Sequence, residues 1–247
     1  MSGKKFVSSK PLYNSRIIDC YLKLIRRNYP LINVADLLDH AGMEFYQVAD
    51  QSHWFSKDQI DRFHEKLRQS ADAERIAREA GRFAAEPDAL GAMRQYILGL
   101  VGPSRAFSLI GQLFSNLTLA SVFTSRRLAS NRVEVTAEPV AGAEERSFHC
   151  ENRMGFFEAM VSLFGRKNPH VEHTECVHRG GLACRYVVSW ENTFSDRLRN
   201  IRLALSGISL GMMSGFSPTS YVSAGIIFIF LFLLFARDFF RDRKSVV

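Results

Sequence analysis

The sequence predicts an α+β fold with a helical N-terminal region, an antiparallel sheet with helices, and transmembrane helices at the C-terminal end. Three observations predict it. Apolar residues recur at helical spacing through the first half of the chain. Residues 132–138 alternate between apolar and polar side chains, which is the two-residue period of a strand. Residues 221–236 contain no charged residue and are dense in Phe, Leu and Ile.

Residues 1–84 form the helical N-terminal region. Residues 12–27 carry apolar side chains at helical spacing, and Asn33 can cap the short helix after it. Ser56 and Gln59 match a capping box before a further amphipathic helix. The arrangement loosely matches a helix-turn-helix, but this last helix mixes basic and acidic residues, so we expect no nucleic-acid partner.

Residues 85–195 mix helices and strands. We expect a long apolar helix over residues 107–127 and a short strand over residues 146–150. The apolar face of the long helix could line a ligand pocket, although ordinary core packing explains the same pattern. The residues expected to contact a ligand are Phe107, Ile110, Leu113, Phe114 and Leu117.

The C-terminal end predicts a transmembrane helical hairpin over residues 199–237, followed by a basic cytoplasmic tail over residues 238–247. The uncharged stretch reaches the length of a membrane span once Pro218 to Ser220 are added. Residues 201–216 are apolar and rich in the small residues that let membrane helices pack closely. One span with an interfacial helix is the alternative.

The distribution of basic residues also favours a membrane. The chain has a net charge of +7, and its basic residues crowd the outer ends of the two apolar stretches. Positive charges stay on the cytoplasmic side, so we expect the inner (cytoplasmic) membrane with the soluble domain facing the cytoplasm. These basic residues are Arg197, Arg199, Arg202, Arg237, Arg241, Arg243 and Lys244.

Three of the four cysteines suggest a zinc site. Cys176 and Cys184 are eight residues apart around a Gly–Gly turn, and Cys150 ends the short strand expected before them. No N-terminal signal peptide is visible, so clustered cysteines are better explained as metal ligands than as disulfides. Zinc prefers four tetrahedral ligands, and the fourth could be His173, Glu172 or Glu175.

Side-chain alternation bears on that fourth ligand. On an ideal strand His173 points away from the face that carries Cys176, so a bulge or bend is needed to bring its ring round. The same alternation favours Glu172 on geometric grounds. We place His173 first because of a family resemblance in the residues around the cysteines.

The sequence C-E-N-R-M-G-F-F-E-A-M at 150–160 and E-H-T-E-C-V-H-R-G-G-L-A-C-R-Y at 172–186 resembles the 4-vinyl-reductase domain family of bacterial sensors. That resemblance implies a Zn²⁺ ion held by Cys150, His173, Cys176 and Cys184, with His173 standing where the family has an acidic residue. It also implies a domain that forms a homodimer and encloses a small, mostly apolar ligand.

From this resemblance we expect a membrane-anchored cytosolic sensor module that signals through a dimer and its membrane segment to an output domain. The short tail after the span suggests that such a domain lies further along a longer receptor. Two alternatives remain. One is a membrane-tethered enzyme or accessory factor of the reductase type, although no P-loop or GxGxxG motif is present. The other is a scaffold that binds no ligand and oligomerises a partner.

Overall fold

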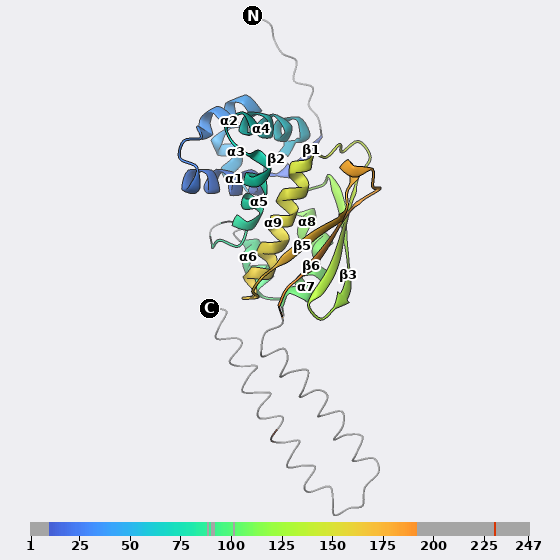
Figure 1. Ribbon diagram of the computed structural model, residues 1–247. Helices are drawn as coiled ribbons and strands as arrows, with labels where there is room; N and C mark the ends of the chain where they lie inside the picture. Colours follow the sequence, from blue (N-terminus) through green and yellow to red (C-terminus); the bar gives the residue numbers. More distant parts are fainter. Residues whose placement is uncertain (1–9, 88, 90–91, 101, 192–229, 231–247) are drawn as a thin grey trace, which may run out of the picture. The chain divides into compact units, whose positions relative to one another are not determined.

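The computed structural model describes residues 10–191, except 88, 90, 91 and 101, and also residue 230 (Figure 1). The chain separates into two compact units, residues 1–190 and residues 191–247. Apart from residue 230, the predicted transmembrane hairpin over residues 199–237 and the basic tail lie outside the described residues. Among the helices that are described, none combines the length and apolar content needed to cross a membrane.

The first part of the described chain is mainly helical, and its caps agree with the sequence signals. Asn33 accepts the amides of Ala35 and Asp36, and Ser56 with Gln59 forms the predicted capping box. The elements are, in order, β1 (Pro11–Asn14), α1 (Ser15–Asn28), α2 (Val34–Ala41), α3 (Phe45–Ala49), β2 (Trp54–Ser56), α4 (Lys57–Ser70) and α5 (Ala73–Phe83). Strands β1 and β2 pair antiparallel.

The second part adds a four-stranded antiparallel sheet in the order β3-β4-β6-β5. Helix α9 packs against α5 and also contacts β5 and β6 (Figure 1). The elements are α6 (Ala92–Leu98), α7 (Pro103–Ser108), α8 (Ile110–Ser115), β3 (Ser121–Ala129), β4 (Arg132–Pro139), α9 (Ser147–Leu163), β5 (His170–Glu175), a 3₁₀ turn η1 (Val177–Arg179) and β6 (Cys184–Ser189). The predicted α+β class and antiparallel sheet are therefore confirmed.

The prediction of one long helix over residues 107–127 is wrong. The chain forms the short helices α7 and α8 and then enters strand β3, whose backbone pairs with β4. Burial explains the change of period, because Phe123 is buried whereas Val122 on the other face is exposed. The strand expected over residues 146–150 is also wrong, because this segment leads into the first turn of α9.

Helices α5 and α9 approach so closely that their backbones touch at two glycines. A Cβ atom at Gly81 would lie 2.1 Å from the Asn152 carbonyl oxygen, and one at Gly155 would lie 1.9 Å from the Arg78 carbonyl oxygen. Only glycine permits this distance. The crossing is reinforced by the carboxylate of Glu158, which is buried and pairs with Arg78 and Arg82 of α5. This crossing positions α9 between the N-terminal helices and the sheet.

Candidate functional site

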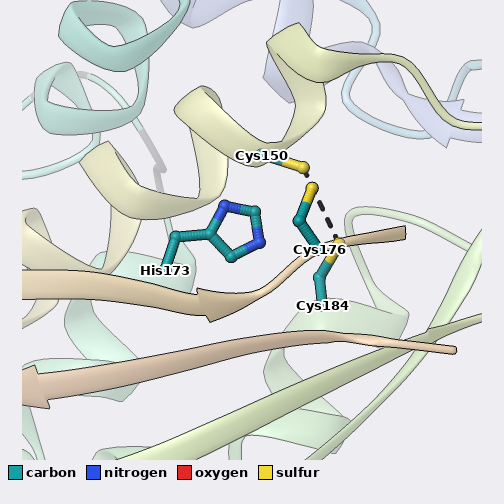
Figure 2. A group of neighbouring side chains, drawn as sticks. All are labelled: Cys150, His173, Cys176 and Cys184. Atoms are coloured by element: carbon teal, nitrogen blue, oxygen red, sulfur yellow. Dashed lines mark hydrogen bonds between the residues drawn. The ribbon is translucent and has the colours of Figure 1, made fainter. Parts of the chain in front are cut away.

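Four potential metal ligands meet between α9 and the β5–β6 hairpin (Figure 2). Cys150 comes from α9, His173 from β5, Cys176 from the residue after β5, and Cys184 from the start of β6. Their ligand atoms all lie within 4.8 Å of one another. The three cysteines are buried, and His173 is half-buried with its Nε2 atom lacking a hydrogen-bond partner. The structure thus brings together all four of the predicted metal-site residues.

Two irregularities of the hairpin produce this convergence. The β5–β6 register shifts between His173 and Glu175, which is the kind of bulge that the alternation of side chains requires. After Cys176 the chain turns through Gly180, whose φ of +87° favours glycine. The bulge turns the His173 ring toward the cysteines, and the ring stacks on Tyr186 with centroids 4.4 Å apart.

The two other carboxylates considered as the fourth ligand have different partners. Glu175 accepts the Leu182 amide at 3.1 Å and pairs with Arg185 at 2.7 Å, so it shapes the loop between the strands. Glu172 is exposed and lies 3.5 Å from His170. The structure therefore places His173, rather than either glutamate, with the three cysteines.

The sulfur atoms of Cys150 and Cys184 lie 3.8 Å apart and are in hydrogen-bonding contact. A hydrogen bond from Cys150 lowers the pKa of the Cys184 thiol, and the nearby His173 lowers it further. The same contact with Cys184, together with burial, raises the pKa of Cys150. A thiolate is the form of cysteine that binds metals. The lowered pKa of Cys184 therefore favours the metal-binding form of this cysteine.

A second feature lies on the other side of the N-terminal turn of α9, where the N-terminal helices meet α5, α8 and α9. It is a cavity of about 50 Å³. Its walls are mixed, with apolar side chains from α1 and α9 and several polar ones. They comprise Tyr13, Arg16, Ile17, Cys20, Tyr21, Ile60, His64, Ala80, Gly81, Ala84, Phe114, Leu117, Thr118, Phe148, His149, Asn152, Arg153 and Phe156.

Two of the five residues predicted to contact a ligand line this cavity. They are Phe114 and Leu117. The other three, Phe107, Ile110 and Leu113, are buried in the core outside the cavity. The apolar pattern of residues 107–117 therefore serves two purposes, because it supplies one wall of the cavity and much of the packing against the sheet.

Sequence reasoning missed the polar groups of the cavity. Four of its residues are almost fully buried and carry a polar atom without a hydrogen-bond partner. This atom is the hydroxyl oxygen in Tyr13 and Tyr21 and a ring nitrogen in His64 and His149. One signal was available, since His64 occupies the apolar face of α4 between Ile60 and Leu67. An ionisable residue among core positions is unusual unless it is paired or functional.

Burial keeps the cavity histidines neutral. Burial lowers the pKa of His64 to about 3, and the nearby Arg68 lowers it further. Burial also lowers the pKa of His149, with the positive charge of Arg153 acting in the same direction. The two rings belong to a single aromatic cluster, in which His64 stacks on Phe148 and His149 stacks on Tyr13. The cavity is therefore lined by neutral rings next to a buried guanidinium.

Solved structures identify the fold. An H-NOX protein from S. oneidensis, in its Fe(II)NO ligation state, aligns with a TM-score of 0.57 at 12% identity over 72% of this chain and 99% of that chain. An oxygen-binding H-NOX domain related to soluble guanylate cyclases aligns with a TM-score of 0.55 at 16% identity over 72% of this chain and 95% of that chain. The fold is the H-NOX fold. No protein-family model and no curated protein matches the sequence.

This comparison corrects two expectations. The resemblance to the 4-vinyl-reductase family is wrong, because the chain shares its fold with H-NOX domains. The short motif around the cysteines misled because it reports only a local arrangement of ligands on a hairpin. The expected Zn²⁺ cofactor, drawn from that resemblance, is also wrong, because the cofactor named for a solved protein of this fold is heme.

Heme does not fit this chain as it is folded. The cavity contains residue types that could coordinate iron, among them His64 and His149. Its volume of about 50 Å³ is nevertheless far below the roughly 300–1,000 Å³ of a cofactor pocket. Its α5–α9 wall cannot open without separating the backbones that touch at Gly81 and Gly155. The function proposed for this chain therefore involves no heme.

Proposed function

We propose that residues 10–190 form a sensor domain that binds a small molecule in the cavity between the N-terminal helices and α9. The observation that carries the proposal is the group of buried polar atoms without partners on the cavity wall, at Tyr13, Tyr21, His64 and His149. Each buried polar atom without a partner costs about 1–3 kcal/mol of stability. A ligand that satisfies several of them would recover that free energy as binding affinity.

The position of α9 suggests how occupancy is transmitted. His149 lines the cavity, whereas the next residue, Cys150, belongs to the metal-ligand cluster. A small rotation or shift at the start of α9 on ligand binding would therefore also move the cluster and the hairpin that holds it. Such a displacement gives a binding module a readout without any catalytic step, so we favour a sensor over the reductase-type enzyme or a scaffold.

The cluster of Cys150, His173, Cys176 and Cys184 is in our proposal a site for a metal ion that ties α9 to the β5–β6 hairpin. Three thiolates and one imidazole within 4.8 Å of one another suit a thiophilic ion.

The metal content of the full chain, together with the absorption spectrum after adding Co²⁺, tests this site. We expect about one ion per chain and the intense visible bands of tetrahedral cobalt–thiolate coordination. Both should be lost in Cys184→Ser but kept in Cys20→Ser, because Cys20 lies outside the cluster. A folded protein that holds no metal and gives no cobalt bands would contradict the site.

The ligand cavity is tested by thermal denaturation of the full chain against a panel of small neutral and anionic molecules. A ligand at 100 times its Kd should raise Tm by about 5–10 °C for a chain of this size. Ala84→Leu, which fills the cavity from the residue that follows α5, should abolish the rise while keeping the far-UV circular dichroism spectrum. If no panel member raises Tm in the wild type, the proposed function is refuted.

The membrane hairpin over residues 199–237 stays a prediction from the sequence, with the sensor domain on the cytoplasmic side. Extraction of cell membranes at alkaline pH tests it, since an integral protein stays with the pellet and a peripheral one is released. The homodimer was expected only from the 4-vinyl-reductase resemblance, and that resemblance is wrong, so it no longer supports a dimer. Light scattering of the purified chain would decide it.

A further inference from the structure

The cavity wall is unusually rich in hydrogen-bond donors. Arg16 Nε and Arg153 Nη1 are buried atoms without a partner, and a guanidinium can only donate. Burial and the negative charge of Glu145 raise the pKa of Tyr13, so its unpartnered hydroxyl keeps a proton to give. These three donors belong to residues of β1, α1 and α9 that line the cavity.

His149 adds a further donor. Its Nδ1 atom receives the Arg146 amide at 3.0 Å, a shorter contact than the 3.2 Å between Nδ1 and the Arg146 carbonyl oxygen. When Nδ1 accepts this amide, the proton of the neutral ring is on Nε2, which has no partner among the described residues and belongs to a residue that lines the cavity. His64 Nδ1 is also unpartnered, and either tautomer is open to it.

The charges near the cavity also favour an acceptor that carries negative charge. Among the described residues, the Arg16 side chain donates to the neutral side chains of Asn14 and Gln51, both at 3.3 Å. The two carboxylates whose charge acts on Tyr13 are each paired through one oxygen, Glu145 with Arg153 and Asp61 with Lys57 and Arg146, and the other oxygen of each has no partner among the described residues. In the part of the chain that the structure describes, the guanidinium of Arg16 has no carboxylate partner, and the two pairs together hold three cations against two carboxylates, so the positive charge around the cavity exceeds the negative charge.

The cavity size limits the ligand to a few heavy atoms. An engineered cavity of about 150 Å³ holds benzene, whereas this cavity measures about 50 Å³. We infer that the cavity binds a small anion of three or four heavy atoms, such as a simple carboxylate or an inorganic oxyanion, through Tyr13, His149 and the two arginines. This inference rests on the proposed function and names the chemical class of its ligand.

Formate and nitrite are the test anions, with formamide as the neutral probe of similar size and benzoate as an anion too large for the cavity. Binding to the full chain is measured by calorimetry at constant ionic strength. We expect formate or nitrite to bind, and formamide at least tenfold more weakly because it lacks the charge that strengthens each hydrogen bond. Benzoate should not compete.

Tyr13→Phe is the decisive variant, because it removes a hydroxyl that has no partner in the part of the chain that the structure describes and should leave folding intact. We expect a loss of about tenfold or more in formate affinity. Tyr186→Phe is the matched control, since this hydroxyl is also buried but does not line the cavity, and the formate affinity of the variant should equal that of the wild type.

The outcomes separate the inference from the proposed function. Tight binding of formamide with no preference for formate, or equal formate affinity in Tyr13→Phe and wild type, overturns the anion inference and leaves a cavity for neutral ligands. Competition by benzoate also overturns it, because the anion site would then lie outside the cavity. Failure of every probe to bind counts against both proposals.

Discussion

Gly155→Ala tests whether the α5–α9 crossing is as tight as the structure shows. The new Cβ would lie 1.9 Å from the Arg78 carbonyl oxygen, whereas ordinary contact begins at 3.4 Å, so the helices must separate by about 1.5 Å. The obstructing atoms belong to the backbone, so no side-chain rotation relieves the clash. Overpacking of this kind costs about 3 kcal/mol, and the better helix propensity of alanine returns about 1 kcal/mol.

We therefore expect Gly155→Ala to lower the free energy of unfolding by about 2 kcal/mol, measured by urea denaturation with circular dichroism. Gly99→Ala is the control, because its nearest neighbouring atom lies at 3.3 Å, and its stability should stay within about 0.5 kcal/mol of the wild type. Equal stability of Gly155→Ala and wild type would refute the reasoning, including the conclusion that this crossing keeps the cavity too small for heme.

Three further predictions concern buried polar groups. The folded pKa of His64 is about 3 and its unfolded value 6.5, so unfolding takes up a proton between these values and stability should fall by up to about 1.4 kcal/mol per unit as pH drops below 6.5. His64→Phe should flatten this part of the pH–stability curve, and an unchanged slope would contradict the assignment. Glu145→Gln leaves the Arg153 guanidinium buried without its ion pair and should cost about 3–5 kcal/mol in urea denaturation, whereas a cost below about 1 kcal/mol would mean that the charge reaches water. A chelator should destabilise the wild type but not Cys184→Ser, and equal melting temperatures with and without chelator in both proteins would count against a bound metal.

Much of the fold could be predicted because local signals agree with tertiary structure. The caps at Asn33 and Ser56 and the strand over residues 132–138 are decided by neighbouring residues in sequence, and the structure has them. Residues 107–127 could not be predicted correctly, because their apolar content suits both helix and strand. Residues 121–129 adopt a strand conformation because they pair with β4, which lies later in the chain.

More of the metal-ligand cluster than of the cavity could be predicted from the sequence. The metal-ligand cluster lies on one hairpin and one helix turn, so spacing along the chain predicted its three cysteines, whereas His173 was placed with them by a family resemblance that was wrong. The cavity draws on β1, α1, α4, α5, α8 and α9, which are far apart in sequence. No spacing rule connects Tyr13 with His149, and only the folded chain places their rings 5.1 Å apart.

The central claim is that the cavity binds a small molecule, and the side-chain ¹⁵N resonances of the histidines report on it most directly. Labelled full chain is titrated with formate, and separately with formamide. We predict saturable shifts at His64 and His149, with no change at the exposed His40 and His170, and loss of the shifts in Ala84→Leu. Unshifted His64 and His149 resonances with both probes at saturating concentration would contradict the account.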